Sequence, residues 1–76
     1  MPTIDLKATG LNIKVKIKEK NIAVKDLKDL LGFGTPQAIY KWFKGATLPT
    51  LDNLVILAKI LDTTLDDLIV LKKAVI

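Results

Sequence analysis

The chain has 76 residues, of which half are hydrophobic and about a quarter are charged, and it contains no Cys and no His. Together with the absence of Ser, this inventory excludes Ser–His and Cys–His catalysis, disulfides and thiolate metal sites. Twelve lysines against eight acidic residues give a net charge of +4, which favours a polyanionic partner: nucleic acid first, an anionic membrane surface second. Lysines that merely keep a small apolar domain in solution explain this mild charge equally well.

No feature of the sequence indicates an enzyme, a metal, a cofactor or a membrane segment. The longest purely apolar runs, such as residues 54–58, are far shorter than the ~20 residues of a bilayer helix. Residues 1–5 lack the basic and apolar stretches of a secretion signal. We therefore expect one non-enzymatic domain over residues 1–76, in the cytoplasm, without cofactor, metal or small-molecule ligand.

The first segment admits two interpretations. Residues 13–18 alternate apolar side chains with lysine, a period of two that by itself predicts a half-buried strand. Thr9 and Gly10, however, are typical of a helix start, and residues 19–21 of a helix end. We interpret the segment as a helix, and the helix-turn-helix pattern described below decides between the two interpretations. Its two apolar stripes are then Ile13 with Ile17, and Leu11 with Val15.

Two short helices are predicted next, separated by a glycine-containing turn. The first covers residues 24–31 and ends at Gly32. Its apolar face is expected to contain Val24, Leu27, Leu30 and Leu31. The second covers residues 36–44, with Thr35 as its N-cap, Pro36 at the first helical position and Gly45 after its end. Its inward side chains are Ile39, Trp42 and Phe43, and its outward ones are Gln37, Ala38, Tyr40, Lys41 and Lys44.

Two further helices complete the predicted fold. Thr50 caps a helix over residues 51–61, in which only Lys59 interrupts an otherwise buried surface. Thr64 caps a short amphipathic helix over residues 64–72. The fold class is therefore all-α, with five short helices around one core. The core is expected to contain Ile39, Trp42, Leu54, Leu57, Ala58 and Leu61.

Helices 24–31 and 36–44, joined by a tight turn, form the pattern of a helix-turn-helix. Residues 31–45 and 48–61, followed by residues 64–68, resemble the phage repressor and Cro type of helix-turn-helix, also called the xenobiotic-response-element family. The resemblance covers about residues 22–70. It implies sequence-specific binding of a double-stranded DNA operator as a homodimer, and a role as a small transcriptional regulator, specifically a repressor.

The resemblance also implies which residues contact DNA. Base contacts fall at the start and on the outer face of the recognition helix: Thr35, Pro36, Gln37, Tyr40 and Lys41. Backbone contacts fall at the start of helix 24–31 and near the end of the recognition helix: Val24, Lys25, Lys44 and Thr47. The chemistry of Gln37 agrees, because a glutamine amide pairs with N6 and N7 of adenine.

One pairing departs from the family pattern. Many members have an Arg in the first helix and a Glu after the aromatic residue of the recognition helix. At the matching positions this chain has Ile17 and Phe43, which predicts an apolar contact instead of an ion pair. The lysines among residues 14–20 are interpreted as a solvated face rather than a DNA clamp.

Two functions remain open at this point. The first is DNA binding, with a homodimer formed through the C-terminal half, where residues 61–76 carry surplus apolar side chains. The second is a protein-interaction module on the same fold, antitoxin-like or a redesigned scaffold, that does not bind DNA. The polar outer face of helix 36–44 and the net positive charge favour the first.

Overall fold

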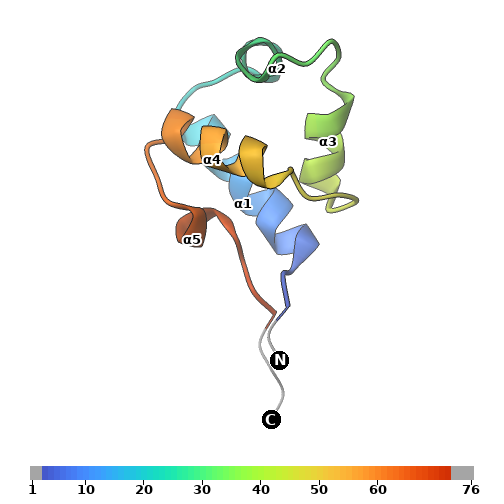
Figure 1. Cartoon of the computed structure of the whole chain (residues 1–76), viewed down its shortest axis with the longest axis vertical. Coiled ribbons are helices and arrows are strands. Elements are labelled where there is room, and N and C mark those ends of the chain that lie inside the picture. The colour runs from blue at the N-terminus through green and yellow to red at the C-terminus, as the bar shows by residue number, and fades with distance from the viewer. Residues whose placement is uncertain (1–2, 73–76) are drawn as a thin grey trace.

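Five helices follow one another in the computed structural model, which describes residues 3–72 (Figure 1). They are α1 (Leu6–Glu19), α2 (Val24–Leu31), α3 (Gln37–Lys44), α4 (Leu51–Ile60) and α5 (Leu65–Leu68). Between residues 3 and 72 the only β pairing is an isolated antiparallel bridge of Ile4 with Leu71. The all-α class is therefore confirmed, and the period-two pattern of residues 13–18 lies on a helix.

Helix α1 begins earlier than predicted. Asp5 is its N-cap, and the Asp5 carboxylate accepts a hydrogen bond from the Ala8 N–H at 2.9 Å. Thr9 and Gly10, predicted at the helix start, therefore lie inside the helix, where both are buried. The close approach of α3 requires a glycine at position 10, because a Cβ there would overlap the carbonyl oxygen of Trp42. What looked like a start signal marks a close helix crossing.

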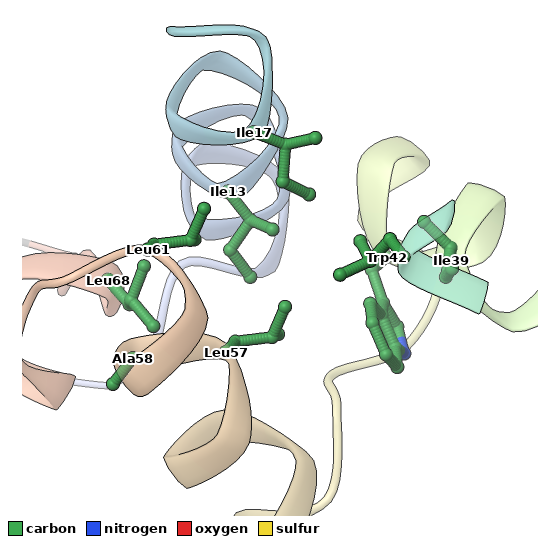
Figure 2. Packing of buried hydrophobic residues seen from close by; sticks show 9 residues of the cluster. Ile13, Ile17, Ile39, Trp42, Leu57, Ala58, Leu61 and Leu68 are labelled. Atoms are coloured by element: carbon green, nitrogen blue, oxygen red, sulfur yellow. The ribbon is translucent and has the colours of Figure 1, made fainter. Parts of the chain in front are cut away.

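The core lies where α1 meets α3 and α4. Figure 2 shows Ile13 of α1 between Trp42 of α3 and the leucines Leu57 and Leu61 at the end of α4. All six side chains predicted for the core are buried, and Ile13 and Leu57 are completely inaccessible. Leu68 of α5 closes the cluster on the side away from Trp42. The core thus fixes the inner face of α3.

The apolar faces of α2 and α4 are narrower than predicted. Helix α2 buries only Leu27 completely, and Leu30 is 61% exposed. On α4, three apolar side chains face solvent, because no element of residues 3–72 covers that side of the helix. They are Leu51, Val55 and Ile56, which are 67%, 41% and 39% exposed. The prediction of a helix buried all round is therefore wrong.

Helix α5 is shorter than predicted, because the chain after it pairs with the N-terminal segment. The expected cap is present: the Thr64 hydroxyl accepts from the Asp67 N–H at 3.2 Å. The helix ends at Leu68, however, and not at residue 72. The Lys72 N–H instead donates to the Thr3 carbonyl at 2.7 Å. Segments 3–5 and 69–72 therefore run side by side at one end of the molecule (Figure 1).

Two polar side chains of α1 fasten this returning segment. The buried Thr9 hydroxyl accepts from the Val70 N–H at 2.9 Å and donates to the Val70 carbonyl at 3.3 Å. The Asn12 amide donates to the carbonyls of Asp67 and Leu68 at 2.7 and 3.1 Å. These carbonyls belong to the last turn of α5, which leaves them without a helical partner. Local sequence signals for a longer helix are thus overridden by tertiary hydrogen bonds.

Helices α1 to α4 each end in a left-handed residue. Gly32 and Gly45 have this conformation as predicted, with φ of 75° and 76°, and Asn21 and Asp62 have it with φ of 57° and 53°. The following amides return to carbonyls of the last turn, the pattern of a Schellman motif. These sharp stops keep the connections between the helices short.

Candidate nucleic-acid interface

The turn between α2 and α3 is held at its α2 end by backbone hydrogen bonds and is packed against α3 by one aromatic side chain. After α2, the N–H groups of Gly32 and Phe33 donate to the carbonyls of Asp29 and Lys28 at 3.1 and 2.9 Å. The half-buried Phe33 ring then packs edge-on against Trp42, with ring centroids 5.8 Å apart. The position of α3 relative to α2 is therefore fixed by backbone bonds and by an aromatic contact to the core.

Helix α3 begins one residue later than predicted. Pro36 occupies the N-cap position, with φ −84° and ψ 4°, and Gln37 is the first helical residue. The Pro36 carbonyl accepts the first helical hydrogen bond from the Tyr40 N–H at 3.2 Å. The assignment of Thr35 as N-cap is therefore wrong: the proline ring holds its own φ near the helical value and takes the cap position, which leaves Thr35 outside the helix.

The N-termini of α2 and α3 differ from those of the other three helices. Side chains of Asp5, Thr50 and Thr64 cap α1, α4 and α5. Helix α2 follows Ala23 and α3 follows Pro36, and neither start receives a side-chain cap. The first N–H groups of these two helices are thus free to bond an external acceptor, and the helix dipole favours an anion there.

The outer face of α3 gathers four of the predicted contact residues. One shallow hollow of about 420 Å³ is lined by Gln37, Tyr40, Lys41 and Lys44. All four side chains are exposed, whereas Ile39 and Trp42 on the opposite face are buried. Ala38 was predicted on the outer face, but it is half-buried against the core. Amide, phenol and ammonium groups therefore share one accessible surface.

The remaining predicted contact residues lie around the two helix starts and beyond the end of α3. Thr35 and Thr47 are exposed, and Pro36 is half-buried. Lys25 is exposed in the first turn of α2. Val24 is half-buried and packs against the core cluster, so at this position the group available to an outside partner is the backbone N–H.

One residue beside this surface was missed. Lys14 was interpreted as part of a solvated face, yet its Nζ lies 5.9 Å from the centroid of the Phe43 ring of α3. The same ring packs edge-on against the Tyr40 ring, with ring centroids 6.1 Å apart. Lys14 lies one helical turn after Gly10, on the side of α1 that meets α3, but the sequence alone does not indicate which side that is. Ile17 also lines the hollow that contains Lys14 and Phe43, but whether Ile17 touches Phe43 stays a prediction.

Charge is divided unevenly between the stretch that forms helices α1 to α3 and the stretch that forms helices α4 and α5. Residues 6–44 carry nine lysines and three acidic residues, whereas residues 51–68 carry one lysine and four acidic residues. Helices α3 and α5 lie on opposite sides of α1 (Figure 1). Within the described part of the chain the one ion pair, Lys28 with Asp29, lies outside the α3 face. The lysines of that face are therefore available to an anionic partner.

Comparison with known families agrees with this architecture. A family model described as helix-turn-helix matches residues 13–68, from within α1 to the end of α5. No curated protein and no solved structure matched the chain.

Among residues 3–72, no helix is long and apolar enough to cross a membrane, and no group of acidic side chains is arranged to hold a metal ion.

Proposed function

The chain belongs to the helix-turn-helix family of the phage repressor and Cro type, a family of DNA-binding domains rather than enzymes, and we propose that it is a small transcriptional repressor that recognises a specific double-stranded DNA sequence. In this proposal α3 enters the major groove as the recognition helix, and α2 lies against the phosphate backbone. The observation that carries the proposal is that α2 and α3 begin without a capping side chain beside an exposed face that carries Lys41 and Lys44.

Base reading is assigned to the first two turns of α3 and the residues just before them. Gln37 is the side chain of this face that can donate and accept hydrogen bonds in the same plane, which suits adenine. Lys41 reaches an acceptor of guanine or a phosphate, and Tyr40 lies beside it on the same face. Thr35 and Pro36 offer a methyl group and a ring edge to a thymine methyl.

Backbone contacts are assigned to both ends of the motif. At the start of α2, the Val24 N–H and the Lys25 ammonium bind one phosphate, which the uncapped helix terminus favours. At the C-terminal end of α3 and just beyond it, Lys44 and Thr47 bind a second phosphate. These contacts set the register of α3 in the groove and carry no sequence information of their own.

Binding is proposed to involve a homodimer formed through the C-terminal half of the chain. Within residues 61–72 the one exposed large apolar side chain is Leu71, at 55%, and the exposed apolar side chains of α4 add to it in support of an apolar contact in this half. The last residues of the predicted contact segment, 73–76, lie outside the described residues. A two-fold arrangement would place two recognition helices about 34 Å apart, one turn of the DNA helix.

Selection of bound duplexes from a random DNA pool, followed by binding assays with two variants, tests the proposal. Gln37→Ala should weaken binding to the selected site by about 1–3 kcal/mol and relax the preference at one base pair. Lys44→Ala should weaken selected and random duplexes alike and lower the salt slope by about one unit. Failure to enrich any sequence, with no salt-dependent binding to random duplex, would refute DNA recognition and favour a protein-interaction module.

A further inference from the structure

We propose that Lys14 of α1 is an additional phosphate-binding residue of the DNA interface, held beside the recognition helix by the ring of Phe43. The inference rests on the proposed function and extends it to a helix outside the helix-turn-helix motif. It assigns to Lys14 a role that its alternating lysine pattern does not suggest.

The approach of α1 to α3 places Lys14 at this surface. At Gly10 the backbones of the two helices are so close that a Cβ would overlap the Trp42 carbonyl. Lys14 is four residues further along α1 and therefore lies on the same side of the helix, one turn onward. Its Nζ lies over the Phe43 ring, 5.9 Å from the centroid.

The Phe43 ring holds the lysine in place. A cation within about 6 Å of a ring centroid is attracted to the negative face of the ring. Lys14 is half-buried, whereas Lys18, one turn further on and lining the same hollow, is exposed. Neither lysine forms an ion pair within residues 3–72. The Lys14 ammonium is thus positioned but not neutralised.

The same ring joins Lys14 to the recognition face. Phe43 contacts Tyr40 edge-on at 6.1 Å, and Tyr40 lines both the outer hollow of α3 and the hollow that contains Lys14. A duplex whose major groove receives α3 would have its phosphate backbone along the edge of this face. The Lys14 ammonium can then bind a phosphate while its methylene stem stays on the ring.

Lys16 provides a matched control on the same helix. It has the same charge two residues away, and it lines a separate hollow together with Leu61 and Asp62 at the end of α4. Lys14→Gln and Lys16→Gln therefore remove equal charge from opposite sides of α1. Thermal unfolding of both variants checks that they fold as the unaltered protein does.

The decisive measurement is the salt dependence of binding to one selected duplex and one random duplex. Lys14→Gln should make the slope of log affinity against log salt concentration shallower by about 0.9 on both duplexes. Over a fourfold rise in salt, the variant should then lose about 3.5-fold less affinity than the unaltered protein loses. Lys16→Gln should leave the slope unchanged. Equal slopes for the two variants, with the unaltered protein binding normally, would overturn this inference alone. Absence of salt-dependent binding by the unaltered protein would overturn the proposed function as well.

Discussion

Gly10 and Gly45 determine how closely α1 approaches α3. A Cβ at Gly10 would overlap the Trp42 carbonyl, and a Cβ at Gly45, whose φ is +76°, would lie 2.7 Å from the Lys7 Cα. Of the two, only Gly45 has its conformation indicated by the local sequence, because it follows the predicted end of a helix. A glycine inside a helix costs up to about 1 kcal/mol relative to alanine, so Gly10 alone suggests a boundary. Its packing role depends on α3, which is distant in sequence.

Gly10→Ala should lower the free energy of unfolding by about 3 kcal/mol, because the added methyl group must push α1 and α3 apart. Urea unfolding followed by Trp42 fluorescence measures this loss. Gly34→Ala is the control, since a Cβ at Gly34 meets nothing within 4 Å. The control should change stability by less than about 1 kcal/mol. Equal effects of the two substitutions would contradict the packing role of Gly10.

Among the helices, those with strong local signals were predicted closely. Helix α2 has the predicted bounds, and α4 begins at its predicted Thr50 cap and differs from the prediction only by one residue at its end. Helices α1 and α5 were mispredicted at the ends that meet the paired segments 3–5 and 69–72. The hydrogen bonds of these segments join residues more than sixty positions apart, which a local pattern does not encode.

The residues of the candidate site also fall into those that the local sequence predicts and those that depend on contacts between helices. Gln37, Tyr40, Lys41 and Lys44 lie on one exposed face as predicted, because their positions within one helix determine which side they share. Lys14 was missed because its place beside Phe43 depends on the packing of two helices. Thr35 was placed one residue wrongly because proline fits both the cap and the first helical position. Position along one helix is predictable from sequence; proximity between helices is not.

The uncapped start of α2 leads to a prediction in which stability and function change in opposite directions. Ala23→Asp should raise the free energy of unfolding by about 1 kcal/mol, because the carboxylate caps the helix and complements its dipole. The same variant should bind DNA more weakly, because that carboxylate occupies the N–H groups assigned to a phosphate and repels it. Thermal unfolding and duplex binding measure the two effects.

Ala23→Ser is the matched variant, since it adds a capping oxygen without charge. It should stabilise the protein similarly and reduce DNA affinity less than Ala23→Asp does. If Ala23→Asp stabilises the protein and leaves DNA affinity unchanged, the start of α2 does not lie at the phosphate backbone.

For the whole molecule, the uneven charge and the exposed apolar residues indicate two separate surfaces. The exposed lysines Lys41 and Lys44 lie on the outer face of α3, whereas residues 51–68, which form α4 and α5, carry four acidic residues and one lysine. Helix α5 lies on the side of α1 away from α3 (Figure 1). The apolar side of α4 is available for a second copy of the chain. A dimer through this half would leave both recognition helices free to reach the same duplex.

At protein concentrations too low to fill an isolated half-site, Val55→Lys should abolish the joint binding of two protein copies per selected duplex that the unaltered protein shows. The reason is that a charge at this 41% exposed position would be desolvated in an apolar contact. Sedimentation equilibrium of the protein–DNA complex gives the stoichiometry. Leu30→Lys adds the same charge at an exposed leucine of α2 and should leave two copies bound. One copy of the unaltered protein per operator, with no two-fold character in the site, would exclude the dimer.

The central claim is that the starts of α2 and α3 and the outer face of α3 receive double-stranded DNA. Titration of a selected duplex into isotope-labelled protein, followed by amide chemical shifts in NMR spectra, tests it residue by residue. The largest changes should occur at the amides of Val24, Gln37, Tyr40 and Lys41, with Leu65 to Leu68 of α5 unaffected. Changes on α4 and α5 with none at the starts of α2 and α3 or on the outer face of α3, or no changes at saturating duplex, would contradict the claim.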